Sequence, residues 1–157
     1  MRIESLCREQ IEQALPMIWD VFCKYEAVNY PASGRDVFWK AIHDPQYLQM
    51  LSAYGAFEEE QLVGIIATRN NGSHIALFFV EGEYHRRGIG RKLMAECLAK
   101  SSSNRITVNS SEYAVEIYER LGFVRTDELK EDSGIRYVPM ECAFSFQPEI
   151  SVSLKNG

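Results

Sequence analysis

The stretch from Glu83 to Met94, "EYHRRGIGRKLM", carries the strongest signal for the fold. It places Gly88 and Gly90 at the start of a segment whose apolar residues recur at helical spacing. Glycine has no Cβ, so its backbone can approach a ligand closely, and the first amides of a helix have no partner within the helix. A strand-like run ends just before this stretch, at Val80. A strand, a glycine turn and a helix in this order predict an anion-binding turn.

The charge of the same stretch favours a ligand with several phosphates. The glycines are surrounded by four basic side chains, Arg86, Arg87, Arg91 and Lys92. The plain alternative is a solvated basic helix start. No GxxxxGK(S/T) motif is present, and the third glycine of a dinucleotide fingerprint would fall at Leu93, so neither usual nucleotide site is indicated.

The totals of the chain predict one domain. Its 157 residues are 46% hydrophobic and 11% aromatic, enough for one core, and we expect a single domain over residues 1–146 with a loose tail over 147–157. The 22 acidic and 17 basic residues give a formal net charge of −5, which argues against nucleic acid or an anionic membrane as the main partner. The sequence is compatible with a homodimer.

The absence of certain sequence patterns predicts the compartment of the protein and the state of its cysteines. No apolar run approaches the ~20 residues that span a bilayer, and the amino terminus has no apolar signal-peptide core, so we expect a cytoplasmic protein. The cysteines lie far apart without a CxxC pair, so we expect no metal site and no disulfide framework. They are Cys7, Cys23, Cys97 and Cys142.

The rest of the chain predicts an α/β domain. We expect a first strand at "RIESLC", a helix from Ile11 to Phe22 that Pro16 starts, kinks or splits, a loop at "KYEAVNYPASG" and a helix over residues 36–43. "LSAYGAFEEE", "QLVGIIATRNNGS" and "HIALFFVEG" predict an antiparallel meander of three strands. "RITVNS" predicts a strand, "SEYAVEIYERLG" a helix with a serine cap and a glycine stop, and "FVRTDE" and "IRYVPMECAFSF" closing strands.

Two stretches resemble the GNAT N-acetyltransferase superfamily. "VEGEYHRRGIGRKL" resembles its acetyl-coenzyme A loop, written (R/Q)xxGx(G/A), with Gly88 and Gly90 at the small positions and His85 where Arg or Gln is usual. "VNSSEYAVEIYERLGF" resembles its second signature, with an Asn at the end of the fifth strand and a Tyr before Leu-Gly-Phe. The resemblance implies the GNAT fold, a mixed and mostly antiparallel sheet flanked by helices, and acetyl-coenzyme A as the cofactor.

The resemblance also implies which residues meet the cofactor. A backbone amide of the fourth strand, near Val80, would face the thioester, which requires that strand to splay from the fifth. Asn109 would bond to the pantetheine arm, although it could equally cap the next helix. The implied cofactor residues are Val80, His85, Arg86, Arg87, Gly88, Ile89, Gly90, Arg91, Lys92, Asn109 and Tyr118.

The implied reaction is acetyl transfer to a primary amine by direct attack in a ternary complex. Tyr118 is the candidate that returns a proton to the leaving thiolate, although helical periodicity alone makes it a core residue. Glu81 and Glu26 are the candidates for the general base, and Tyr30 could position the substrate beside Glu26. Cys97 lies in an apolar stripe without a recognisable His partner, which disfavours a covalent cysteine mechanism.

Fold alone does not establish activity, so one alternative stays open. The same scaffold could be a catalytically silent acyl-coenzyme A-binding module that regulates a partner. The acceptor also stays open at this point, since a small amine, an amino acid, a polyamine, a peptide amino terminus and a lysine side chain all fit the sequence.

Overall fold

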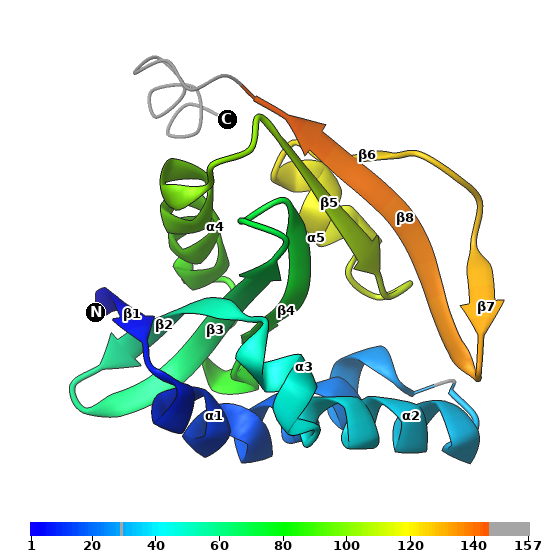
Figure 1. The fold of residues 1–157 in the computed structure, drawn as a ribbon, viewed down its shortest axis with the longest axis horizontal. Coiled ribbons are helices and arrows are strands. Elements are labelled where there is room, and N and C mark those ends of the chain that lie inside the picture. Colours follow the sequence, from blue (N-terminus) through cyan, green and yellow to red (C-terminus); the bar gives the residue numbers. More distant parts are fainter. Residues whose placement is uncertain (29, 145–157) are drawn as a thin grey trace.

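The computed structural model describes residues 1–28 and 30–144, so the predicted tail over 147–157 lies outside the described residues. An eight-stranded mixed sheet runs in the order β1-β2-β3-β4-β5-β8-β6, with β7 paired to β8 (Figure 1). The strands are β1 (Arg2–Leu6), β2 (Ser52–Glu58), β3 (Gln61–Arg69), β4 (His74–Val80), β5 (Arg105–Ser110), β6 (Val124–Arg125), β7 (Lys130–Asp132) and β8 (Ile135–Ala143). The mixed, mostly antiparallel sheet that the sequence predicts is confirmed.

Helices cover both faces of this sheet (Figure 1). They are α1 (Arg8–Val21), the π-helix η1 (Phe22–Glu26), α2 (Ala32–Ile42), α3 (Pro45–Gln49), the short 3-10 helix η2 (Gly82–Tyr84), α4 (Ile89–Lys100) and α5 (Val115–Arg120). The helices α1, α2 and α3 pack on one buried cluster, the α1–α2 core, and α4 and α5 pack on a second, the α4–α5 core. The cavity described below lies between these two cores.

The meander of β2, β3 and β4 forms as predicted. Its pairs are antiparallel, and the connecting turns contain residues with positive φ, including Glu59, Asn70 and Asn71. Asparagine tolerates this left-handed conformation better than most residues. Polar turn residues between alternating apolar runs therefore located the turns correctly.

The pair β4 and β5 is the feature that positions the site. These strands run parallel and pair only at His74 with Thr107 and at Ile75 with Val108, although β4 continues to Val80. Beyond these two pairs the strands diverge, which leaves one edge of β4 without a strand partner. The splay that the sequence analysis required is present.

The amino-terminal helices differ from the prediction. Helix α1 runs through Pro16 and is followed directly by the π-helix η1, closed by a hydrogen bond of 2.9 Å from the Ala27 amide to the Phe22 carbonyl. Glu26 therefore ends a helix instead of lying in the predicted loop. Helix α2 starts at Ala32, and α3 and β7 have no counterpart in the sequence prediction. Short elements carry too little periodicity to be recognised.

The carboxyl-terminal hairpin of β7 and β8 reaches back to α2, and its tip lies beside that helix in Figure 1. Gly34 and Gly134 touch there through backbone, because a Cβ on Gly34 would lie 2.1 Å from the Gly134 carbonyl oxygen. The Tyr30 hydroxyl donates a hydrogen bond of 2.6 Å to the Arg136 carbonyl nearby. We call these two contacts the α2–hairpin bridge.

Replacing Gly34 with alanine should destabilise the fold. The added Cβ has no room against the Gly134 backbone, and overpacking of this kind reduces stability by about 1–3 kcal/mol. Asp36→Ala, at an exposed position of the same helix, serves as the control. Urea unfolding of both variants tests this, and equal midpoints for Gly34→Ala and the wild type would contradict the contact.

Candidate active site

One cavity of about 720 Å³ lies at the gap between β4 and β5. Its lining includes Phe22 and Tyr30 from the α1–α2 core and Ile89 and Tyr118 from the α4–α5 core. The cavity therefore passes through the gap between the splayed strands β4 and β5 and reaches both faces of the sheet. Two ligands could enter from opposite sides and meet at the gap.

The backbone of β4 presents polar groups to this gap. The Glu81 amide donates a hydrogen bond of 2.8 Å to the Val63 carbonyl, and Val80 is paired with Gly64 one position earlier. Hydrogen-bonded and non-hydrogen-bonded pairs alternate along antiparallel strands, so the N–H and C=O of Val80 point away from β3 and toward the gap. The Val80 amide is thus placed where a hydrogen-bond donor can stabilise a developing oxyanion.

The start of α4 provides unpaired amides at the same cavity. Gly88 caps the helix with a φ of 80° and no side-chain cap is present. The first bond within the helix is that from the Lys92 amide to the Gly88 carbonyl, 3.1 Å long. The amides of Ile89, Gly90 and Arg91 therefore have no partner within the helix, and their residues line the cavity. Free amides of this kind are what the predicted anion-binding turn requires.

Replacing Gly90 with valine should weaken the binding of acetyl-coenzyme A at least about tenfold. A Cβ here would lie 3.3 Å from the Phe78 ring, so a branched side chain occupies space beside the free amides and presses on a cavity wall. Ala99→Val, at an exposed position of the same helix, is the control for β-branching. Calorimetric titration gives the affinities, and unchanged affinity in a folded Gly90→Val protein would rule out the amide cradle.

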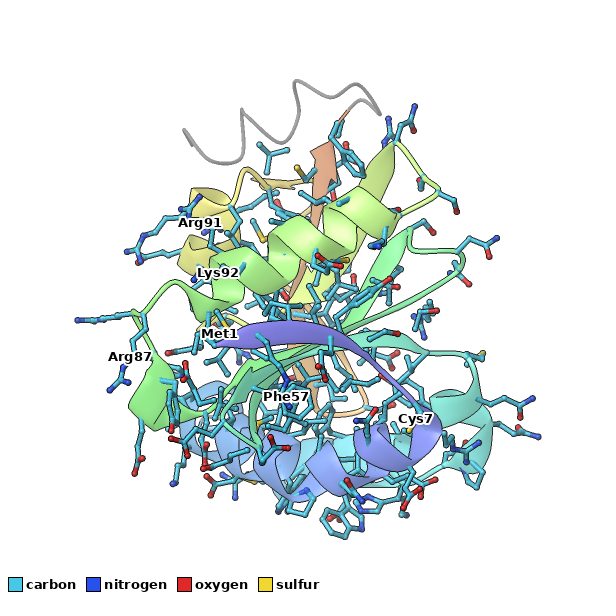
Figure 2. The ribbon with its side chains drawn as sticks, turned by 90° about the vertical axis from the view of Figure 1, so that its left-hand side faces the viewer. Met1, Cys7, Phe57, Arg87, Arg91 and Lys92 are labelled. Carbon is cyan, nitrogen blue, oxygen red and sulfur yellow. The ribbon has the colours of Figure 1, made fainter. Side chains whose placement is uncertain are left out.

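The basic side chains divide into two groups. Arg86 and Arg91 line the cavity, whereas Arg87 and Lys92 do not. The Arg87 guanidinium lies over the Tyr84 ring at 5.1 Å, a cation–π contact. Figure 2 shows Arg87, Arg91 and Lys92 around the start of α4, at one edge of the molecule. Of these four basic residues, only Arg86 and Arg91 therefore lie where a ligand in the cavity could meet them directly.

Neutralising the two cavity arginines that flank the glycines, Arg86→Gln with Arg91→Gln, should lower the affinity for acetyl-coenzyme A by about tenfold or more. The matched double variant, Arg87→Gln with Lys92→Gln, removes the same charge outside the cavity lining and should change it much less. Titrations at two salt concentrations separate long-range attraction from contact. Equal losses in the two double variants would contradict this division.

The His85 side chain is hydrogen-bonded to the backbone at the end of β4. Its Nε2 lies 2.6 Å from the Val80 carbonyl oxygen, and because a carbonyl only accepts, this nitrogen carries the proton. The ring packs on Tyr25 at 4.9 Å, and Tyr25 in turn packs on Tyr113 at 5.5 Å. His85 therefore joins the loop before α4 to the end of β4.

Tyr118 is both a core residue and a cavity residue. It is 5% exposed, and its ring packs on Phe78 at 5.8 Å and on Phe123 at 5.2 Å. Burial first, and then the negative charge of Glu26, hold the pKa of Tyr118 well above its ordinary value of 10. Its hydroxyl forms no hydrogen bond to any residue that the structure describes. Tyr118 therefore keeps its proton at neutral pH and can offer it to a ligand.

Glu26 lies at the end of η1 and lines the same cavity. Burial raises the pKa of this carboxyl from 4.5 to about 7, and a hydrogen bond with Ser111 opposes the rise. Ser111 is buried and its hydroxyl also accepts a hydrogen bond of 3.2 Å from the Ala114 amide. A carboxyl that titrates near neutral pH suits a general base.

The remaining candidates are placed as follows. Asn109 is exposed at the end of β5 and lines the cavity, and Tyr30 lines it with a ring whose hydroxyl is bonded to Arg136. Glu81 does not line the cavity, because its carboxylate turns toward Gln61 and accepts a hydrogen bond of 3.3 Å. The structure therefore brings Glu26, and not Glu81, to the site.

Other reactive side chains do not contribute. Burial raises the pKa of the Cys97 thiol to about 12, and Cys97 does not line the cavity, so it has neither the charge nor the place of a nucleophile. All four cysteines are free. In residues 1–28 and 30–144 no group of three or more His, Cys, Asp or Glu side chains could hold a metal ion.

The cavity residues that the sequence analysis missed include three with polar side chains: Ser111, Tyr113 and Arg120. Ser111 was interpreted only as part of a helix cap, but α5 starts after Ala114 without a side-chain cap. Arg120 forms an ion pair of 3.8 Å with Glu116 on α5, which is an ordinary surface pattern. Only the fold, which brings α5 and the start of α4 to the same cavity, shows that Arg120 adds charge there.

The mixed sheet, the splayed β4–β5 pair and the glycine turn before α4 agree with the fold that the sequence analysis expected. The sequence matches the family model of the acetyltransferase (GNAT) domain over residues 22–144, and the chain therefore belongs to the GNAT acetyltransferase family.

Solved structures share this fold. A GCN5-related N-acetyltransferase from Rhodopseudomonas palustris superimposes with a TM-score of 0.74 at 15% identity, covering 91% of this chain and 95% of that chain. YjaB from Escherichia coli in its apo form gives 0.70 at 19% identity, covering 92% and 100%. The PaiA N-acetyltransferase from Thermoplasma acidophilum, solved in complex with coenzyme A, gives 0.66 at 18% identity, covering 92% and 100%.

None of the helices in residues 1–28 and 30–144 has the length and apolar character needed to cross a bilayer.

Proposed function

We propose that this protein transfers the acetyl group of acetyl-coenzyme A to a primary amine by direct attack in a ternary complex. One observation supports this most: a single cavity combines the free amides of α4, the gap-facing Val80 amide, the Tyr118 hydroxyl and the Glu26 carboxyl. Membership of the GNAT family supports acyl transfer in general. The acetyl group, the amine acceptor and the residue roles are the proposal.

The residues present fit acetyl-coenzyme A. The free amides at the start of α4 and the cations Arg86, Arg91 and Arg120 suit its phosphates, and Gly90 keeps the approach open. The unpaired edge of β4 suits an extended, amide-bearing arm, and Asn109 offers a donor and an acceptor across the gap. Bound there, acetyl-coenzyme A supplies an acetyl thioester at the gap.

Glu26 is the proposed general base. An alkylamine with a pKa near ~10.4 is neutral in only about one molecule in a few thousand at pH 7, so it must lose a proton before it can attack. Glu26, with its pKa near 7, can take that proton directly or through one water. Ser111, in the same cavity, is the hydrogen-bond partner of the carboxyl.

Val80 and Tyr118 are proposed to stabilise the two charges that develop. The Val80 amide donates to the carbonyl oxygen, and the Tyr118 hydroxyl donates to the leaving sulfur. Thiols ordinarily have a pKa near ~8.5, below that of Tyr118, so a strong hydrogen bond is easier than complete proton transfer. Tyr118 therefore acts mainly as a hydrogen-bond donor to the leaving sulfur.

Initial-velocity kinetics test the proposal. Release of coenzyme A thiol should depend on both acetyl-coenzyme A and an amine, and reciprocal plots should intersect, as a ternary complex requires. Parallel lines would indicate an acetyl-enzyme and overturn direct attack. Binding of acetyl-coenzyme A without amine-dependent thiol release across a broad amine panel would favour the silent regulatory module.

A further inference from the structure

The end of the cavity that faces α1 and α2 is lined mainly by apolar side chains. We call it the acceptor end, formed by Val21, Phe22, Glu26, Tyr30, Phe38 and Ile135. The Phe22 ring stacks on Phe38 at 3.9 Å and meets Tyr30 edge-on at 5.7 Å. These rings come from η1, α2 and the loop between them, so the fold holds them together without a ligand. An apolar ligand body gains most from such a surface.

Charge at the acceptor end is confined to one available carboxyl, that of Glu26. The Tyr30 hydroxyl is already donated to the Arg136 carbonyl, and the Arg136 guanidinium forms an ion pair of 2.8 Å with Glu112. Asp132 lines the cavity from the exposed strand β7, close to Arg136 in sequence, and accepts a hydrogen bond from Ser133. A ligand with one ammonium group has a partner in Glu26, whereas the other carboxylate near this end, Asp132, lies on the exposed strand β7 and offers a second ammonium group only a solvated partner.

The α2–hairpin bridge limits the size of the acceptor. A polypeptide that presents a lysine side chain needs an open groove across which its backbone can lie. Here the backbones of Gly34 and Gly134 are in contact, and the Tyr30 hydroxyl is bonded across the same space at 2.6 Å. The acceptor end is thus closed between α2 and the hairpin.

We propose that the acceptor is a small primary amine with a single positive charge and an aromatic or branched apolar body, in preference to a polyamine or a lysine of a polypeptide. The inference rests on the proposed acetyl transfer and specifies its substrate class. The aromatic rings bind the body of the amine, and Glu26 takes the proton of its ammonium group.

A kinetic comparison of matched amines tests this inference. The probes are 2-phenylethylamine and isopentylamine, against putrescine, spermidine and an acetyl-capped lysine peptide, each with saturating acetyl-coenzyme A. We expect kcat/KM to be at least about tenfold higher for the two apolar monoamines, a ratio typical of burying a few methylene groups. Equal or higher values for putrescine, spermidine or the peptide would overturn the inference and leave acetyl transfer intact. No turnover with any amine would overturn both.

Two substitutions on one helix localise the preference. Phe38→Leu should reduce the ratio of kcat/KM for 2-phenylethylamine over putrescine by about threefold to tenfold, while Trp39→Leu, whose ring is 45% exposed and outside the cavity lining, should leave the ratio unchanged. If Phe38→Leu does not fold, Ile135→Ala carries the same expectation. A folded Phe38→Leu or Ile135→Ala protein with the wild-type ratio would contradict the assignment of the acceptor end.

Discussion

The Tyr118→Phe protein is expected to fold and bind acetyl-coenzyme A normally but to turn over about 10²-fold to 10³-fold more slowly when chemistry limits the rate. The substitution removes only the hydroxyl, which forms no hydrogen bond to any described residue, and it keeps the ring contacts with Phe78 and Phe123. Loss of one preorganised donor to a developing charge typically slows catalysis by this amount.

Three measurements on the same protein decide between the roles of Tyr118. These are kcat, the acetyl-coenzyme A affinity and the melting temperature, with Tyr54→Phe, outside the cavity lining, as the control. If Tyr118 only packs in the core, kcat stays near that of the wild type. That result in a chemistry-limited assay would remove Tyr118 from the mechanism.

Replacing Glu26 with glutamine is expected to lower kcat/KM by about 10²-fold to 10⁴-fold above pH 7. In the wild type, kcat/KM should rise with pH and bend near pH 7, because burial raises the pKa of Glu26 to about 7. The variant should lose this bend and keep only the rise from ionisation of the amine. Glu81→Gln is the matched comparison, since Glu81 lies outside the cavity lining, and a larger loss in that variant would reverse the choice of base.

Stability gives a second, independent readout of Glu26. Its pKa is 4.5 ordinarily and about 7 in the folded protein, so the unfolded chain releases this proton first as the pH rises. Stability is then lost between these two values, and Glu26→Gln should be more stable than the wild type at pH 8 by on the order of 2 kcal/mol, with little difference at pH 4. Equal stability of the two proteins at both pH values would show that Glu26 is not buried enough to be a neutral-pH base.

The sequence predicted what periodicity and special residues determine. Alternation located β2, β3 and β4, and the glycines located the start of α4, because Gly88 adopts a φ of 80° that other residues avoid. The family resemblance identified Tyr118, which periodicity alone would have left in the core. These features depend on residues that are neighbours in the chain.

Features that depend on distant packing could not be predicted. The splay of β4 from β5 was required by the family resemblance but could not be derived from the residues themselves. The division of the cations into Arg86 and Arg91 inside the cavity and Arg87 and Lys92 outside it follows from how strands and helices pack. From the sequence alone, nothing distinguishes Glu26 from Glu81 as the general base. Only the π-helix, which turns Glu26 into the cavity while Glu81 bonds to Gln61, distinguishes them.

The fate of a labelled acetyl group tests the account most directly. The protein is mixed with trideuteroacetyl-coenzyme A and 2-phenylethylamine, and mass spectrometry follows the label on the protein and on the amine. The account predicts that the label appears on the amine nitrogen, one for each coenzyme A thiol released, and that the protein alone with the thioester gains no label. Label on the protein before the amine is added, or thiol release without an acetylated amine, would contradict direct transfer at this site.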